Sequence, residues 1–242
     1  MVTLVLKSCR SWLGVAREHA WGLPLVLGNA SVVREYARQL RLLRDGGAAL
    51  AAGRGVPTII GELGIPFDLS GAAAYRSGDF RLQISAMHTT LQALDMALLS
   101  ATLWNYTPDN TNAHGDGWNG EDLSVFSRDQ IAPGREDDLF AGGRALQAVV
   151  RPCAVRCAGT PLRMSFDLAT RTFCFEFEHD PDVAGAPTII FVPFFQYPQP
   201  PRISVSDGTT SFAMLAQTLE YRHDPACGRV HALTIAPASL AA

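Results

Sequence analysis

The segment Pro57-Thr-Ile-Ile-Gly-Glu-Leu-Gly-Ile-Pro-Phe-Asp68 decides the fold that we expect for the first part of this chain. Its apolar, β-branched start shows no polar alternation, which is typical of a parallel strand that is buried on both faces. The run ends in a carboxylate, Glu62, and Gly61, Gly64 and Pro66 interrupt the chain around it. Because parallel barrels carry reactive side chains at strand ends, we expect Glu62 at the C-terminal mouth of a barrel strand.

A second strand-like run occupies residues 101–106 and opens into a polar loop over residues 107–135. Trp104 stands near the end of this run, and an indole ring there can lie flat under a sugar ring. We favour this role over that of an ordinary core tryptophan. The loop contains Asp116 and Trp118, which can shape a sugar site or simply hold the loop through hydrogen bonds to its own backbone. The sequence favours neither role for the loop.

Residues 1–150 alternate between helical and strand patterns. Apolar positions from Val33 to Leu43 predict a helix that Ser31 caps and that Asp45-Gly-Gly47 stops. Strand, helix, strand, helix is βαβ architecture with right-handed crossovers. The further expected elements are a strand at 56–61, a helix at 82–100, a strand at 103–106 and a helix at 138–150.

The pattern changes at Arg151, where short β-rich runs separated by turn residues begin. Phe173, Phe175 and Phe177 alternate with polar or small residues, so one face of that strand is expected to be buried. Six such strands predict a β-sandwich over 151–242. They are expected at 164–167, 172–178, 188–192, 202–206, 217–222 and 230–235.

Composition narrows the class of protein. The 242 residues carry a net charge of −3, so no global field draws the chain to nucleic acid. No apolar run approaches the ~20 residues needed for a transmembrane segment. The five cysteines are an odd number without framework spacing, so we expect free thiols and a cytoplasmic location.

The sequence predicts neither a metal site nor a cofactor-binding site. His114 and Asp116 alternate and His179 precedes Asp180, but neither pair has further ligands at suitable spacing. We interpret both histidines as surface residues and predict no metal site. No phosphate-binding glycine loop or nucleophile elbow is present, so no cofactor is predicted.

Several segments together resemble glycoside hydrolase family 5, and within it the endoglycoceramidase-related branch that includes fungal steryl-glucosidase relatives. The resemblance extends over roughly residues 2–235. The motifs that carry it are Ile60–Asp68, Leu103–Asn110, Gly115–Ser124, Arg151-Pro152, Ala158–Pro161 and Phe166–Thr170.

The resemblance implies an α/β domain followed by an all-β domain. Residues 1–150 would be a partial (β/α)8 TIM barrel, namely strands seven and eight with their outer helices, and residues 151–242 an accessory β-sandwich. The implied activity is that of a retaining β-glycosidase acting on glucosylceramide, other glycosphingolipids or steryl glucosides, without a cofactor. Glu62 would be the nucleophile. We favour this role over the alternative, in which the Glu62 carboxylate caps a helix or pairs with an arginine. The expected substrate-binding residues are Trp104, Asn105, Asp116, Trp118 and Asn119.

A retaining glycosidase also needs an acid/base carboxyl, and the family carries it in an Asn-Glu pair on strand four. None of the five asparagines here is followed by glutamate. Nothing around Glu121 or Asp122 would raise a carboxyl pKa enough to replace that acid. We therefore expect a truncated gene product that lacks an N-terminal half-barrel and is inactive alone. The alternatives are a carbohydrate-binding, lipid-binding or interaction module, and one half of a split enzyme.

Overall fold

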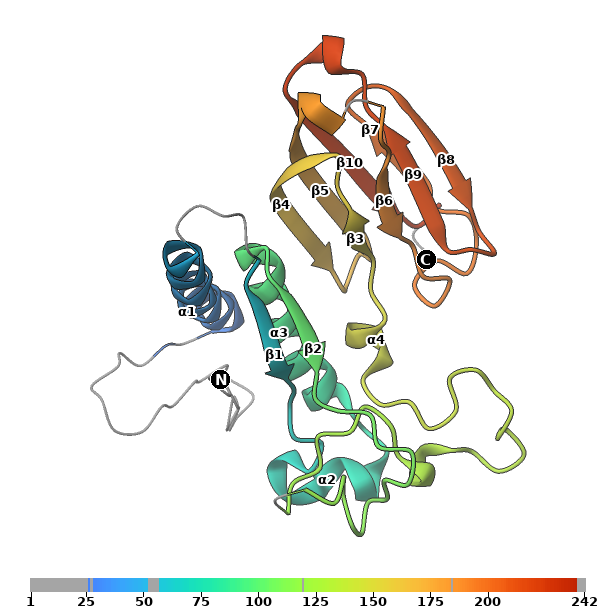
Figure 1. The fold of residues 1–242 in the computed structure, drawn as a ribbon. Helices are drawn as coiled ribbons and strands as arrows, with labels where there is room; N and C mark the ends of the chain where they lie inside the picture. Colours follow the sequence, from blue (N-terminus) through green and yellow to red (C-terminus); the bar gives the residue numbers. More distant parts are fainter. Residues whose placement is uncertain (1–25, 27, 52–56, 119, 184, 239–242) are drawn as a thin grey trace. The chain divides into compact units, whose positions relative to one another are not determined.

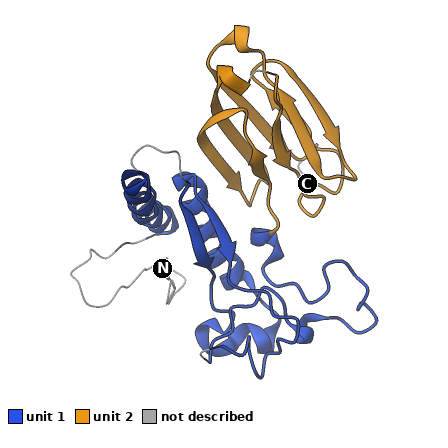
Figure 2. Cartoon of the chain, in the orientation of Figure 1, with its two compact units in different colours: residues 1–149 blue, residues 150–242 orange. Residues whose placement is uncertain are grey.

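The computed structural model describes residues 26, 28–51, 57–118, 120–183 and 185–238, which form two compact units divided between Val149 and Val150 (Figures 1 and 2). Each unit has its own hydrophobic core. Within these residues, no helix has both the length and the apolar character needed to cross a bilayer. Four cysteines are free, and Cys9 lies outside the described residues.

The first unit is built on two parallel strands, β1 (Ile59–Leu63) and β2 (Ser100–Leu103), joined by two helices. Ile59 pairs with Ser100, and the register shifts between Ile60 and Leu63, where one strand bulges. This is a βαβ unit, as the alternating pattern predicts. The other elements are α1 (Asn29–Leu50), α2 (Leu69–Ser77), α3 (Arg81–Ala97), η1 (Arg128–Gln130) and α4 (Leu146–Val149).

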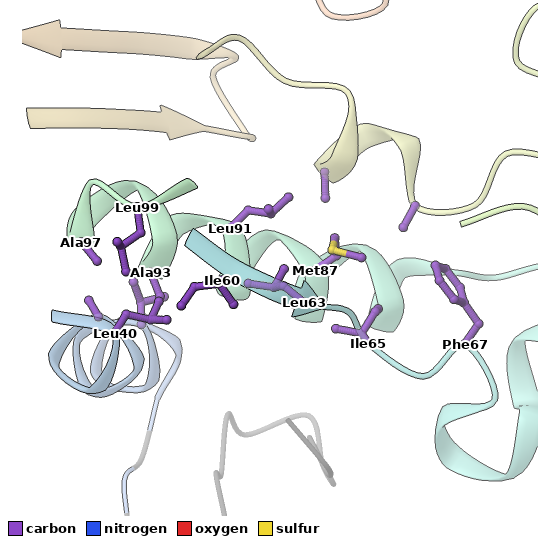
Figure 3. Packing of buried hydrophobic residues seen from close by; sticks show 14 residues of the cluster. Leu40, Ile60, Leu63, Ile65, Phe67, Met87, Leu91, Ala93, Ala97 and Leu99 are labelled. Carbon is purple, nitrogen blue, oxygen red and sulfur yellow. The ribbon is translucent and has the colours of Figure 1, made fainter. Parts of the chain in front are cut away.

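The core of this unit lies between β1 and the helices α1 and α3. Figure 3 shows Leu40 of α1 and Ala93 of α3 beside Ile60 of β1, and Met87 of α3 near Leu63. All five side chains are at most 7% exposed. Burial of each large aliphatic side chain contributes about 1.5–3 kcal/mol, so this cluster fixes β1 against the helices.

Helix α1 differs from its predicted limits at both ends. It begins at Asn29 with Gly28 as N-cap, and the hydroxyl of Ser31 instead accepts a hydrogen bond from Arg34. It also continues through the glycines at 46 and 47 to Leu50. A glycine in a helix costs only about 1 kcal/mol, which the packing of the apolar face outweighs. The predicted cap and stop were therefore wrong.

The strands of the first unit begin and end earlier or later than predicted. Helix α3 ends at Ala97 because Leu98 adopts a left-handed conformation with φ 52°, so Ser100 already belongs to β2. Trp104 consequently follows β2 and is not inside it, whereas Glu62 lies inside β1, one residue before its end. The prediction of a doubly buried strand was also wrong, because Ile59 is 59% exposed.

The predicted helix over 138–150 is reduced to α4, a single turn. Asp138 accepts a hydrogen bond from the backbone N–H of Phe140, which closes a local turn in place of a helix start. Gly142 then adopts φ 73°, a left-handed conformation that ends any regular run. These local interactions override the helical pattern.

The second unit consists of two antiparallel four-stranded sheets, ordered β4-β5-β10-β7 and β3-β6-β9-β8. Phe173, Phe175 and Phe177 are buried, as their alternation predicts, and they share one core with Leu219 and Tyr221 of the other sheet. All six predicted strands are present, and β3 and β8 were missed. The strands are β3 (Cys153–Arg156), β4 (Gly159–Asp167), β5 (Thr172–His179), β6 (Thr188–Phe191), β7 (Arg202–Val205), β8 (Thr209–Ala213), β9 (Thr218–Arg222) and β10 (Val230–Ala236).

Candidate active site

The backbone on both sides of Glu62 is bound to the end of β2. The carbonyl of Leu63 accepts a hydrogen bond of 2.9 Å from the backbone N–H of Trp104. The carbonyl of Gly61 accepts a hydrogen bond from the hydroxyl of Thr102. Because the C-terminal ends of parallel strands meet at one edge of a sheet, these bonds bring Glu62 and Trp104 to the same edge.

Gly64 allows the chain to pass close to Trp104. A Cβ atom at this position would lie 2.1 Å from the carbonyl oxygen of Trp104. That oxygen belongs to the backbone, so it cannot rotate away as a side chain would. At Gly61, in contrast, a Cβ atom would have no neighbour within 4 Å. The two glycines that flank Glu62 therefore have different roles.

We predict that Gly64→Ala destabilises the first unit by about 1–3 kcal/mol, the usual cost of forcing an extra methyl group into a packed region. Gly61→Ala is the matched control and should change the free energy of unfolding by less than about 0.5 kcal/mol. Urea denaturation of both variants measures the difference. Equal stability of the two variants would contradict the proposed close approach at Gly64.

Glu62 is partly buried at the C-terminal end of β1. It borders a small hollow that is lined also by Tyr36 and Leu40 of α1 and by Thr90 and Ala93 of α3. The lining is mostly apolar. In the described part of the chain, the Glu62 carboxylate forms no ion pair with an arginine.

Trp104 and Trp118 form an aromatic corner beside this strand end. Their ring centroids are 6.4 Å apart, and the rings meet edge to face at 64°. Trp104 is partly buried and Trp118 is 59% exposed, so the second ring is open to a ligand. The Trp104–Asn105 peptide bond is cis. An indole corner of this kind offers the flat apolar surface to which the C–H face of a sugar binds.

Asn105 and Asp116 interact directly with one another. The Nδ2 of Asn105 donates to Oδ2 of Asp116 at 2.8 Å, and Asp116 also accepts hydrogen bonds from the backbone N–H groups of Trp118 and Leu123. These contacts are the loop-holding role that the sequence left open for Asp116. The carboxylate fixes Trp118 relative to the segment that follows Trp104. Asn119 lies outside the described residues.

A buried ion pair below the loop was not predicted from the sequence. The two terminal guanidinium nitrogens of Arg144 donate hydrogen bonds to Asp122, at 2.8 and 2.5 Å, and the two side chains are only 0% and 5% exposed. Tyr75 of α2 and Asn110 of the loop donate further hydrogen bonds to the same carboxylate. Arg144 also lies over the ring of Phe67, 4.2 Å from its centroid. The network ties α2, the polar loop and the segment before α4 together.

The charges of this network are fixed at neutral pH. Burial raises the pKa of Asp122, but the hydrogen bonds from Arg144 and Tyr75 outweigh it and lower the pKa below its usual value. Burial and the hydrogen bond to the Asp122 carboxylate raise the pKa of the Tyr75 phenol. Asp122 is therefore ionised and cannot act as a general acid, in agreement with the sequence argument.

Comparison with known proteins identifies the class. Residues 151–235 match the sequence profile of the glycoside hydrolase family 5 C-terminal domain. The sandwich of the second unit thus corresponds to the C-terminal domain of this family. The similar proteins include a glucosylceramidase and an ergosteryl-beta-glucosidase.

Three relatives document this placement. A glucosylceramidase of Rhizopus delemar is 34% identical over 210 residues, which cover 81% of this chain and 30% of that enzyme. An ergosteryl-beta-glucosidase of Saccharomyces cerevisiae is 26% identical, with 83% of this chain and 33% of that enzyme covered. The crystal structure of Cryptococcus neoformans sterylglucosidase 1 matches with a TM-score of 0.79 and 28% identity, covering 89% of this chain and 34% of that chain.

A more distant structure agrees in fold alone. Endo-glycoceramidase II from Rhodococcus matches with a TM-score of 0.54 at 19% identity and covers 84% of this chain. The chain spans 24–33% of the length of the curated relatives that it matches.

Proposed function

We propose that this chain supplies the nucleophile, Glu62, and a sugar platform, Trp104, to a retaining β-glycosidase that acts on glycolipids. The observation that carries the proposal is the hydrogen bond between the Trp104 N–H and the Leu63 carbonyl, because it holds the backbone of Trp104 beside the strand end that bears Glu62. In this proposal β1 and β2 are the last two strands of a TIM barrel, whose strand ends bear the catalytic residues.

The chemistry needs two carboxyl groups about 5–5.5 Å apart. The Glu62 carboxylate attacks the anomeric carbon while the glycosidic C–O bond breaks, and an acid donates a proton to the departing oxygen. The same acid, now a base, takes a proton from water, whose oxygen attacks the anomeric carbon and releases Glu62. We propose that this second group comes from sequence outside these 242 residues, since none of the five asparagines precedes a glutamate.

The substrate that we propose is a β-glucoside of a lipid. The similar proteins are named glucosylceramidase and ergosteryl-beta-glucosidase, which supports ceramide or sterol as the lipid part. The aromatic corner of Trp104 and Trp118 fits a glucosyl group, whose axial C–H bonds form an apolar face.

The proposal is tested by joining this chain to the N-terminal portion of sterylglucosidase 1, the part that the chain does not cover. The chimera should hydrolyse an aryl β-glucoside and glucosylceramide, and the 242-residue chain alone should hydrolyse neither. Turnover by the chain alone would contradict the missing acid. An inactive, folded chimera, together with binding of glucosylceramide vesicles by the chain alone, would favour a non-catalytic binding module.

In the active chimera, Trp104→Ala should raise the KM for the aryl β-glucoside about 5–10-fold, because a stacking contact contributes about 1–1.5 kcal/mol. Tyr106→Ala removes an aromatic ring that is 65% exposed two residues further along the chain, and it serves as the control. Steady-state kinetics measure both variants. The platform role would be wrong if Tyr106→Ala raised KM as much as Trp104→Ala.

A further inference from the structure

Three histidines from three strands meet at one end of the sandwich. His179 ends β5, His231 lies in the adjacent antiparallel strand β10, and His223 follows β9 of the other sheet. One ring nitrogen of each lies within 4.8 Å of the others. The sequence interpretation of His179 as a surface histidine without further ligands was therefore wrong, because strand pairing supplies two more imidazoles.

The ring of His231 is held in one tautomer. It is fully buried, and its Nδ1 lies 2.8 Å from the Oδ2 of Asp207. Asp207 also accepts hydrogen bonds from the hydroxyl of Ser206 at 2.6 Å and from the backbone N–H of Asp224 at 2.7 Å. Asp207 is thus a carboxylate that only accepts, so Nδ1 of His231 carries the hydrogen. The lone pair of His231 is on Nε2, which faces the cluster.

Nitrogens of the other two rings lie within 4.8 Å of the His231 nitrogen. Nδ1 of His179 lies 2.9 Å from Nε2 of His231 and shares one hydrogen with it. Nδ1 of His223 is buried and has no hydrogen-bond partner in the described structure. A buried polar atom without a hydrogen-bond partner lowers the stability of the fold by about 1–3 kcal/mol. The unpaired Nδ1 of His223 therefore needs an explanation.

Packing of neutral rings does not provide that explanation. The ring centroids of His223 and His231 are 4.3 Å apart, and Phe177 lies 5.5 Å from each of them. These tilted and edge-to-face ring contacts leave Nδ1 of His223 without a hydrogen-bond partner. A cation among the three rings would accept lone pairs from all of them and replace the single hydrogen that His179 and His231 share.

We propose that His179, His223 and His231 bind a divalent transition metal, with zinc as the favoured ion, and that Asp207 orients His231 as its hydrogen-bonded carboxylate. Imidazole nitrogens bind Zn²⁺ at about 2.0–2.1 Å, which places two such nitrogens about 3.4 Å apart in a tetrahedral site. Closing the cluster from its present separations of up to 4.8 Å needs only small ring movements. A histidine that binds zinc commonly donates its other ring N–H to a carboxylate, as His231 does to Asp207.

The site would join the two sheets of the sandwich. His179 and His231 belong to one sheet, whereas His223 follows the last residue of β9 in the other. A metal bound to all three would resist separation of the sheets at this end, and its binding free energy would add to the stability of the folded chain. Three protein ligands leave the fourth tetrahedral position for water.

The test uses the full 242-residue chain, purified without a histidine tag and treated with a chelator. Titration with zinc chloride in a calorimeter should give one zinc per chain. Free zinc at 100-fold above the Kd should raise the Tm by about 5–10 °C. The absence of both binding and a zinc-dependent shift in Tm would overturn the proposal.

Variants assign the ligands. His179→Ala and His223→Ala should each weaken zinc binding by more than about 100-fold, and Asp207→Asn by about 10–100-fold. His114→Ala removes an exposed histidine outside the cluster and should leave zinc affinity unchanged. Zinc-free circular dichroism confirms that each variant is folded. Unchanged affinity in the double variant His179→Ala/His223→Ala would show that zinc binds elsewhere and would refute the site.

Discussion

Glu62→Gln is expected to abolish hydrolysis of an aryl β-glucoside by the chimera of this chain with the N-terminal portion of sterylglucosidase 1. Glutamine has the same shape as glutamate but a neutral amide, which is a poor nucleophile toward an anomeric carbon. The loss should be about 10⁴-fold or more, as expected when a covalent nucleophile is removed. Initial rates with a chromogenic glucoside measure it.

Trapping of the intermediate identifies the nucleophile directly. A 2-deoxy-2-fluoroglucosyl fluoride should transfer its sugar to Glu62 with release of fluoride, because the electron-withdrawing fluorine at C2 slows hydrolysis of the glycosyl-enzyme. Peptide mass spectrometry should then place the sugar on the peptide that contains Glu62. Glu136→Gln, which changes an exposed glutamate in the same unit, should keep both turnover and labelling. A label on any other carboxylate would show that Glu62 is not the nucleophile.

The sequence predicts the presence of strands in this chain better than their ends. The β-branched run before Glu62 and the alternating phenylalanines identify β1 and β5, because the burial of a strand face determines which positions are apolar. The ends depend on pairing and on single backbone conformations. The left-handed conformation of Leu98 ends α3, so β2 begins earlier in the sequence than predicted. No residue type near Leu98 indicates this conformation.

For the candidate site, the sequence indicates only the geometry that follows from pairing of the two parallel strands. Glu62 and Trp104 each stand near a strand end, so their shared edge follows from parallel pairing. The Arg144–Asp122 pair and the three-histidine cluster join residues that lie on different segments of the chain and have no characteristic spacing. One signal was available for the cluster: His179 and His231 each fall at the ends of predicted strands. Their pairing, however, requires knowledge of the sheet order.

Arg144→Met is expected to lower the free energy of unfolding by about 3–5 kcal/mol. The guanidinium is fully buried and makes hydrogen bonds to Asp122 and to the carbonyl of Ser124. Its removal leaves a carboxylate at 5% exposure without a counter-ion, and an ionised group without a partner in such a site is the costly species. Urea denaturation at pH 7 measures the loss. Arg135→Met breaks an exposed pair with Asp138 and should cost at most about 1 kcal/mol.

The double variant Arg144→Met/Asp122→Leu separates loss of the pair from exposure of an unpaired charge. Because it removes both ions, it should be more stable than Arg144→Met alone.

The stability of the wild type and of Arg144→Met should also depend differently on pH. The pKa of Asp122 is lowered in the folded chain, so its contribution is present above the unfolded pKa of about 3.9 and is lost as the pH falls through the folded pKa. Arg144→Met should therefore lose less stability than the wild type on acidification below about pH 4. Two results together would show that the charges of the pair do not hold the loop beside Trp104. The double variant would be no more stable than Arg144→Met, and Arg144→Met would lose as much stability on acidification as the wild type.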